Sequence, residues 1–279
     1  MQQTPDADRV GAAVKNNEGE WVLLNGNQTA LMFVYYLITR WKELGKIQGK
    51  EYIVKTIVTT ETIKTIADRN GVGFYDVYTG FKWIANVMKQ NEGKLNYIGG
   101  GEESYGFLCE DFVRDKDAVS ACAVLAEIAA WAKDQGMSMY QLLQKIYVEY
   151  GFSKEKGISV VKKGKSGAEE IEAMMKHFRE NPLKEIAGSK VTYFYDYSTL
   201  KGIDYLENET LTLDMPVTSN VLQFFTEDGT KVSIRPSGTE PKIKFYCEVH
   251  SKVNSVEELD AADKAATEKI EAIKASLGI

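Results

Sequence analysis

Short apolar runs alternate with longer stretches of helical spacing between residues 21 and 150, and this alternation limits the fold more than any other feature of the chain. The runs WVLL, YIVKTIVT and FYDVYT have the length and residue types of strands, and residues 96–98 form a fourth. Strands that alternate with helices predict a layered α/β domain. The expected helices cover residues 28–44, 61–70, 81–90, 118–133 and 139–149.

Residues 151–279 follow a different pattern, in which strands are grouped and helices lie apart from them. Strand-like segments at 221–226 and 230–234 flank Asp228-Gly229, a pair that favours a tight hairpin. Residues 242–250 alternate apolar and polar side chains, as a strand buried on one face does. This grouping predicts a smaller α+β domain. Further elements are expected as a strand at 190–197, a helix from the box at 166–169 to Arg179, and a helix at 257–277 started by Ser255 with Glu258.

The loop between the last two expected strands, Arg235–Lys242, concentrates groups that bind phosphate. Arg235 offers a planar fork of donors, and Ser237 and Thr239 add short neutral donors. Gly238 allows a ligand to approach the backbone closely. The alternative for such a loop is a solvated turn. Its place at the end of a sheet favours binding, because binding groups are commonly held by rigid elements.

The segment RPSGTEPKIKFY at 235–246 resembles the phosphate-binding loop of the alpha-D-phosphohexomutases, the family that contains phosphoglucomutase and phosphomannomutase. In that family the loop holds the phosphate of the substrate sugar. The resemblance implies a mixed-sheet α/β domain of the phosphoglucomutase third-domain type, followed by a TBP-like α+β C-terminal domain. It also implies the phosphate ligands Arg235, Ser237, Gly238 and Thr239.

The segment Gly101–Ser104 resembles the sugar-binding loop of the same family. The resemblance implies that Glu102 or Glu103, together with Ser104, binds sugar hydroxyls. Without it, an ordinary turn would be the simpler interpretation. The GEES form resembles the glucose-type members, and Ile146–Phe152 resembles a branch that includes phosphopentomutase-like enzymes.

Two lysine motifs also occur in the family's order. Thr79–Lys82 resembles the segment that precedes the sugar loop, and this implies a substrate contact for Lys82. Arg114–Asp117 lies where the family places a lysine suspected of acid/base chemistry, which makes Lys116 the candidate catalytic residue. By residue type alone, both lysines would be solvated surface groups.

The segment Thr4–Arg9 resembles the family's metal loop, in which three carboxylates hold Mg²⁺ and an arginine follows. Here Asp6 and Asp8 are present, Arg9 lies next to them, and Thr4 replaces the first carboxylate. Two carboxylates alone make a poor Mg²⁺ site. We therefore expect an incomplete metal site in this chain, with Mg²⁺ bound only in the full-length enzyme, or a frayed and solvated N-terminus.

The family's reaction needs a serine, in a Thr-Ala-Ser-His-like loop, that carries the transferred phosphoryl group, and these 279 residues contain no such segment. In family terms the sequence begins at the metal loop. We therefore expect residues 1–20 to be the remnant of a preceding domain. Residues 21–150 would be the sugar-recognition domain, and residues 151–279 the phosphate-binding domain.

The resemblance implies the C-terminal part of a sugar-phosphate mutase that interconverts hexose 1-phosphate and hexose 6-phosphate through that phosphoserine. Its ligands would be glucose 1-phosphate, glucose 6-phosphate and glucose 1,6-bisphosphate, and this part alone would be inactive. A non-catalytic phosphosugar-binding or scaffold protein stays open as the alternative. Glucose, mannose and pentose phosphates are not ranked by these residues.

Composition excludes several other classes of protein. The net charge of -6 leaves no basic patch for nucleic acid, and no apolar run reaches the roughly 20 residues that span a bilayer. The sequence starts without a basic and apolar leader. Cys109, Cys122 and Cys247 are widely spaced, as reduced thiols of a cytoplasmic protein are. We therefore expect a cytoplasmic protein without nucleic-acid or membrane partners.

Overall fold

A computed structural model describes the protein at residues 1–162, 164–238 and 240–279. By their contacts, these residues form two compact units. Unit 1 comprises residues 1–151 with 254–256, and unit 2 comprises residues 152–253 with 257–279. Residues 1–20, which we expected to be the remnant of a preceding domain, are part of unit 1.

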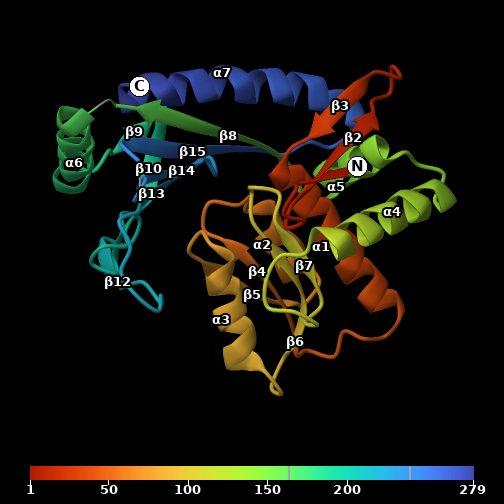
Figure 1. The fold of residues 1–279 in the computed structure, drawn as a ribbon. Coiled ribbons are helices and arrows are strands. Elements are labelled where there is room, and N and C mark those ends of the chain that lie inside the picture. The colour runs from red at the N-terminus through yellow and green to blue at the C-terminus, as the bar shows by residue number, and fades with distance from the viewer. Residues whose placement is uncertain (163, 239) are drawn as a thin grey trace. The chain divides into compact units, whose positions relative to one another are not determined.

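Unit 1 is built around a four-stranded sheet with the order β5-β4-β6-β7. β5, β4 and β6 run parallel, and β7 is antiparallel to β6, so the sheet is mixed. The predicted α/β architecture is confirmed, and each predicted helix ends within two residues of its expected bounds. The strands are β4 (Glu51–Thr56), β5 (Gly73–Val77), β6 (Asn96–Gly101) and β7 (Phe107–Cys109). The helices are α1 (Gly26–Glu43), α2 (Thr62–Arg69), α3 (Phe81–Asn91), α4 (Ala118–Asp134) and α5 (Met139–Tyr150) (Figure 1).

Helix α1 starts at a complete capping box. The side chain of Asn25 accepts a hydrogen bond from the backbone N–H of Gln28 at 2.8 Å, and the side chain of Gln28 accepts one from the N–H of Asn25 at 2.9 Å. Two N–H groups that the first turn cannot satisfy are thereby satisfied. The cap fixes where the chain enters α1, and so the position of Gly26.

The sequence patterns miss three strands of unit 1. Two of them are β1 (Gln2–Gln3) and β2 (Val10–Lys15). β2 is the central strand of a separate antiparallel sheet and pairs with β1 and with the predicted strand β3 (Trp21–Leu24). A frayed N-terminus is therefore not what the structure shows. β7 is only three residues long, too short for a recognisable pattern. The predicted strand at 96–98 also continues to Gly101, because three glycines lengthen it without adding an apolar signal.

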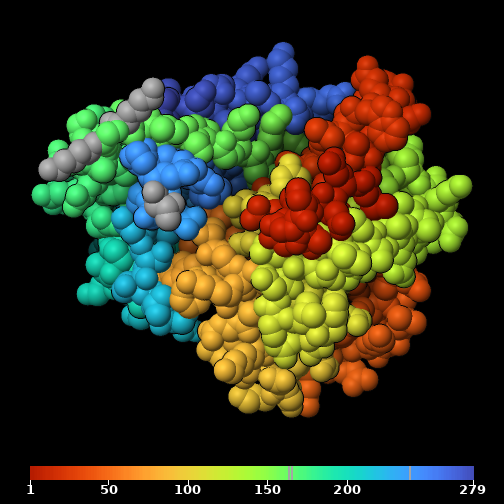
Figure 2. Space-filling model, viewed as in Figure 1, coloured from red at the N-terminus to blue at the C-terminus, as the bar shows by residue number. Residues whose placement is uncertain are grey.

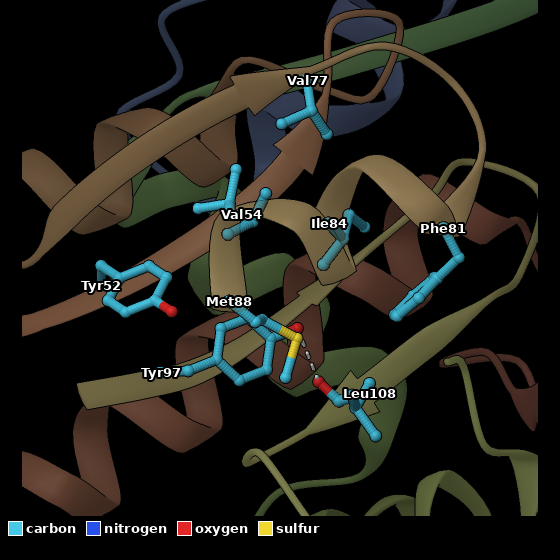
Figure 3. Close-up of a cluster of buried hydrophobic side chains, with 9 residues drawn as sticks. Tyr52, Val54, Val77, Phe81, Ile84, Met88, Tyr97 and Leu108 are labelled. Atoms are coloured by element: carbon cyan, nitrogen blue, oxygen red, sulfur yellow. Dashed lines mark hydrogen bonds between the residues drawn. The ribbon is translucent and has the colours of Figure 1, made fainter. Parts of the chain in front are cut away.

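A compact core joins α3 to one face of the mixed sheet (Figure 3). The hydroxyl of Tyr97 on β6 donates to the carbonyl of Leu108 on β7 at 3.3 Å. Val54 of β4 and Ile84 of α3 are 1% and 0% exposed. This packing fixes the ends of β4 and β6, from which the loops of the candidate site extend. The core comprises Tyr52, Val54, Val77, Phe81, Ile84, Val87, Met88, Tyr97 and Leu108.

Unit 2 is built around an antiparallel sheet with the order β12-β11-β10-β13-β14-β15-β8, and β9 pairs with β10. Helix α7 (Leu259–Leu277) runs along β8 and β15, and α6 (Gly164–Glu180) follows β8 (Figure 1). The predicted α+β architecture is confirmed. The strands are β8 (Phe152–Val161), β9 (Glu185–Ile186), β10 (Ser189–Asp196), β11 (Lys201–Asp204), β12 (Glu209–Thr212), β13 (Leu222–Thr226), β14 (Lys231–Pro236) and β15 (Lys242–Ser251).

The tight turn predicted at Asp228-Gly229 joins β13 to β14. Gly229 has a φ of 81°, which glycine adopts without strain. The carboxylate of Asp228 accepts hydrogen bonds from the hydroxyls of Thr226 at 2.7 Å and Thr230 at 2.8 Å. This turn sets the register that places Arg235 at the end of β14.

Unit 2 differs from the expected elements in two places. β8, which the sequence patterns do not predict, is a ten-residue strand that pairs with β15. It is an edge strand, and lysines are common at edges because they discourage pairing with other chains. The predicted helix at 257–277 is preceded by a short 3-10 helix, η1 (Val256–Glu258), so the α-helix α7 begins at Leu259 instead of Glu257. No helix in the described ranges has the length and apolar content to cross a membrane.

Candidate functional site

The first candidate site lies in unit 1, where the strand order of the mixed sheet reverses. From β4 the chain continues to β5 on one side and then to β6 on the other. Ligands of open α/β sheets commonly bind beyond the carboxyl ends of strands at such a reversal. The loop of residues 102–106, which follows β6, and the segment 57–60, which follows β4, both extend from this edge. We call residues 102–106 the glutamate loop.

Glu102 is buried and fixed at both its side chain and its backbone. Its carboxylate Oε1 accepts a hydrogen bond from the N–H of Gly80 at 2.7 Å. Its own N–H donates to the carbonyl of Gly106 at 2.9 Å. Gly80 has a φ of 112°, where a side chain would be strained. This bond joins two segments that the sequence identifies separately, Thr79–Lys82 and the glutamate loop.

Glu103 is held by two buried threonines at the end of β4. Its N–H donates to the hydroxyl of Thr59 at 3.2 Å, and its Oε2 accepts from the hydroxyl of Thr56 at 3.3 Å. The two hydroxyls lie 2.8 Å apart, and both side chains are fully buried. Asn27 of α1 fixes the same segment by accepting from the N–H of Thr60 at 3.0 Å. Ser104, the third predicted sugar ligand, is half-buried beside these groups.

Helix α1 approaches the glutamate loop so closely that only glycine fits at its first residue. A Cβ on Gly26 would lie 1.9 Å from the carbonyl oxygen of Glu103 and 2.8 Å from the amide nitrogen of Tyr105. Both are backbone atoms, which cannot rotate away. Tyr105 has a φ of 71° and its carbonyl accepts from the N–H of Val10 at 3.2 Å. The loop is thus enclosed by α1 and β2 as well as by the threonines.

Lys116 and Asp8 form an ion pair beside the glutamate loop. The Lys116 Nζ lies 3.1 Å from Asp8 Oδ2 and 3.3 Å from Asp115 Oδ1. Burial alone would lower the pKa of Lys116, but the hydrogen bonds to Asp8 and Asp115 outweigh it and raise that pKa. A Cβ on Gly106 would lie 2.6 Å from Lys116 Cδ and 3.5 Å from Glu102 Oε2. The structure therefore brings three predicted site residues together, Glu102, Lys116 and Asp8.

The residues of the resembled metal loop do not fit Mg²⁺. The Thr4 hydroxyl donates to Asp8 Oδ1 at 2.9 Å, and Lys116 takes the other oxygen. Burial alone would raise the pKa of Asp8, but the bonds from Lys116 and Thr4 lower it. Asp6 and Arg9 are exposed, and no group of three acidic, histidine or cysteine side chains suited to a metal exists among the described residues. Figure 2 shows the N-terminal residues, in red, lying against yellow-green residues of the same unit.

Lys82 lies in a different environment from the glutamate loop. It is exposed on the first turn of α3, with its Nζ 5.0 Å from the centre of the Trp83 ring. It lines a cavity of about 610 Å³, whose other lining residues come from α3, Glu92 and residues 111–114. None of the lining residues belongs to the glutamate loop.

The second candidate site is the phosphate loop of unit 2, residues 236–242. The N–H of Ser237 donates to the carbonyl of Lys242 at 2.8 Å, and the N–H of Glu240 donates to Ser237 Oγ at 3.3 Å. Lys242 Nζ lies 2.7 Å from Glu240 Oε2. Gly238 is exposed with open space around its Cα. The predicted ligand Thr239 lies outside the described residues.

The strands on either side of this loop place cations on one face of the sheet. Arg235 of β14 lies directly opposite Lys244 of β15. Lys242 is two residues from Lys244, so its side chain leaves the strand on the same face. A cavity of about 640 Å³ lies beside the loop, between Ser237 and Lys242 on one side and Met175 and Arg179 of α6 on the other.

Arg179 is held firmly at that cavity. Its Nε donates to Asp196 at 3.1 Å, and its Nη2 donates to Asn220 at 2.7 Å. Sequence reasoning misses Arg179 and Lys244, and in unit 1 it misses Thr56, Thr59 and Gly26. The run of threonines directly after a buried strand was a usable signal, because side chains there face a ligand-binding edge. The cross-strand partner of Arg235 required a register that local patterns do not give.

Two family models match this chain. One describes the alpha/beta/alpha domain III of phosphoglucomutase/phosphomannomutase and covers residues 25–150. The other describes the C-terminal domain of the same family and covers residues 160–266. The chain is 38% identical over 242 residues to a phosphoglucomutase of Staphylococcus aureus strain MRSA252. That match covers 87% of this chain and 43% of the relative, so the chain spans less than half the length of that protein.

Solved structures share the fold. Parafusin, a phosphoglucomutase of Paramecium in its open form, matches with a TM-score of 0.58 and 18% identity, covering 97% of this chain and 44% of that one. The N-acetylphosphoglucosamine mutase of Aspergillus fumigatus, in complex with GlcNAc-6P and magnesium, matches with a TM-score of 0.50 and 14% identity, covering 98% of this chain and 48% of that one. At these identities the likeness shows the fold alone.

Proposed function

The chain belongs to the phosphoglucomutase/phosphomannomutase family, and from that premise we propose that it supplies sugar and phosphate recognition to a phosphoglucomutase-type reaction. The reaction moves a phosphoryl group between the 1- and 6-positions of a hexose phosphate. The serine that carries this group would come from the part of the relatives that this chain does not span. The proposed ligands of this chain are glucose 1-phosphate, glucose 6-phosphate and glucose 1,6-bisphosphate.

A pair of like charges is the observation that carries this proposal. Arg235 and Lys244 lie opposite each other on neighbouring strands, and such pairs destabilise a sheet. The Glu240 carboxylate forms its salt bridge with Lys242, and Lys244 acts on Glu240 only through a weaker electrostatic interaction. No salt bridge of Arg235 or Lys244 is found among the described residues. A phosphate group would neutralise both cations, and Ser237 adds a hydroxyl donor beside them. We propose Arg235, Ser237, Gly238 and Thr239 as the phosphate ligands, with Lys244 in support.

Sugar recognition is assigned to the glutamate loop of unit 1. We propose that Glu102 or Glu103, together with Ser104, binds sugar hydroxyls. Hydrogen bonds fix the backbone and the carboxylate of both glutamates, which holds the loop in place for such contacts. The crystallised fungal mutase binds GlcNAc-6P, a hexose phosphate, which supports this class of ligand.

Lys116 is proposed as the acid/base partner of the sugar hydroxyl, and Lys82 as a further substrate contact. Lys116 lies beside Glu102, because the side chains of both residues would contact a Cβ placed on Gly106. General acid/base catalysis requires a group within hydrogen-bonding reach of the reacting oxygen. An intact relative carrying Ala at the equivalent lysine should lose most of its turnover. Undiminished turnover would remove this role.

Binding of glucose 6-phosphate to this chain tests the phosphate site. We expect weak binding in a calorimetric or NMR titration, and an affinity roughly tenfold lower for Arg235→Ala, because a charge-assisted bidentate contact is lost. Lys190→Ala is the matched control, since it removes an exposed cation from the same unit away from the loop. Equal binding by wild type and Arg235→Ala would refute the assignment.

Phosphosugar binding without chemistry is the second candidate function. The metal loop favours it, because Thr4 replaces a carboxylate and Asp8 is occupied by Lys116. DNA sequence upstream of the Met1 codon discriminates the two functions. An in-frame extension that encodes a Thr-Ala-Ser-His-like loop supports the mutase, whereas a stop codon followed by a genuine start supports the binding protein.

A further inference from the structure

We infer that a lysine ammonium closes residues 4–9 of this chain in the place where its family resemblance puts a divalent cation. Both oxygens of the Asp8 carboxylate already carry donors. The Thr4 hydroxyl lies 2.9 Å from Oδ1, and Lys116 Nζ lies 3.1 Å from Oδ2. A hard cation such as Mg²⁺ needs several oxygen ligands held together, and here the Asp8 carboxylate is occupied and Asp6 is exposed.

The hydroxyl of Thr4 does what a carboxylate could not. It accepts from the N–H of Arg9 at 3.2 Å and at the same time donates to Asp8. An ionised Asp at this position could only accept hydrogen bonds, and it would repel Asp8. Thr4 therefore removes the charge repulsion that a metal ion would otherwise have to offset.

The backbone of the loop is closed as well. The N–H of Ala7 donates to the carbonyl of Thr4 at 2.9 Å, and the N–H of Thr4 donates to the carbonyl of Arg9 at 3.0 Å. The N–H of Ala118, at the start of α4, donates to the carbonyl of Ala7 at 3.0 Å. Lys116 lies two residues before this contact. The loop is therefore attached to the Lys116 segment by a backbone bond and by the ion pair.

Titration with Mn²⁺, a paramagnetic stand-in for Mg²⁺, tests whether residues 4–9 bind a divalent cation. Amide NMR signals of residues 5–9 in the wild type should show no saturable broadening, and Thr4→Ser, which keeps the hydroxyl, should behave alike. Thr4→Asp should show saturable broadening that Asp8→Asn abolishes. Saturable broadening in the wild type would overturn the inference. If Thr4→Asp also fails to bind Mn²⁺, Thr4 is not the reason why residues 4–9 bind no metal ion, and that part of the inference is overturned.

Amide hydrogen exchange tests whether the Lys116 ammonium holds residues 4–9 in their closed arrangement. In Lys116→Met, the amides of Ala7 and Ala118 should exchange roughly threefold faster, as loss of a partly covered ion pair implies. Lys64→Met is the matched control, because it removes the Lys64–Asp68 ion pair on α2 and should leave both amides unchanged. Unchanged exchange in Lys116→Met would overturn the role of the ammonium. Neither experiment uses a sugar phosphate, so each outcome is independent of the proposed function.

Discussion

The glutamate loop and the phosphate loop are built in opposite ways. Hydrogen bonds with Gly80, Thr56 and Thr59 fix the glutamate loop, and α1 encloses it at Gly26. The phosphate loop lies beside two cations of the strands that flank it, Arg235 of β14 and Lys244 of β15. The difference follows from what each loop is proposed to recognise. A hydrogen bond to a hydroxyl weakens steeply with angle, whereas the attraction between charges falls slowly with distance.

Within unit 2, one face of the sheet carries paired opposite charges at one end and two facing cations at the other. At one end Lys231, Glu248 and His250 form a buried network, with Lys231 Nζ 2.9 Å from Glu248 Oε2 and His250 Nε2 2.7 Å from Glu248 Oε1. At the other end Arg235 faces Lys244. The paired charges of the network stabilise the fold, whereas the two facing cations are available to bind an anionic ligand.

Gly26→Ala should have the largest effect, because it removes the close approach that encloses the glutamate loop. Its Cβ would overlap the carbonyl of Glu103, so we expect a loss of about 3 kcal/mol in the stability of unit 1. Urea unfolding followed by tryptophan fluorescence measures this, since Trp21, Trp41, Trp83 and Trp131 all lie in unit 1. Gly11→Ala is the control, with its nearest atom 3.9 Å away. Equal stability of the two variants would contradict the prediction.

Thr59→Val should cost about 2 kcal/mol in the same assay, because the N–H of Glu103 loses its acceptor and a buried hydroxyl partner is lost. Thr59→Ser keeps the hydroxyl and should preserve the chemical shift of the Glu103 amide, which Thr59→Val should change. If both variants shift this amide equally, the threonine does not position the loop.

The histidine network should give unit 2 a pH-dependent stability. Burial lowers the pKa of His250, but Glu248 outweighs it, so the pKa is raised above 6.5 and the stabilisation is fully present below that pH. It should fall as pH rises through the raised pKa. Glu248 has a lowered pKa, so its contribution is present above 4.5 and is lost only in strong acid. Glu155 and Lys231 also act on His250 with opposite signs.

Hydrogen exchange of β15 amides between mildly acidic and alkaline pH measures this dependence. His250→Gln should lower the stability of unit 2 by about 1 kcal/mol in mild acid and change it little in alkali. A wild-type profile that stays flat on the alkaline side would contradict the prediction.

Arg235→Gln should have the smallest effect on stability, and the opposite sign. Relief of the repulsion with Lys244 should stabilise unit 2 by about 0.5 kcal/mol at low salt. The gain should disappear in high salt or with added phosphate, because both screen the pair. Lys190→Gln serves as the control, and hydrogen exchange of β14 amides is the readout. Destabilisation by Arg235→Gln would mean that the cation supports the fold.

Local patterns predict the helices well and several strands poorly. The helices of unit 1 have long periodic segments, and α1 also has a full capping box. β8 lacks a continuous apolar signal because it is a Lys-rich edge strand, and β7 is too short to produce one. These strands form because partners distant in sequence supply their hydrogen bonds.

The candidate site divides in the same way. Glu102, Ser104, Lys116 and Arg235 belong to contiguous motifs, so the sequence alone makes them candidate site residues. Thr59, Gly26 and Lys244 act through partners 44 or more residues away or across a strand pair, as the bond between Thr59 and Glu103 illustrates. Their roles depend on register and close approach, which no local pattern records.

The pairing of β8 with β15 affects how the chain is made. Phe152 pairs with Ser251, so β8 leaves the ribosome long before its partner exists. At ordinary synthesis rates this delay lasts about 5–20 s. During that time β8 is an unpaired strand that could join a neighbouring chain. Lys154 and Lys156 place charges along it, which would keep nascent chains apart until β15 arrives.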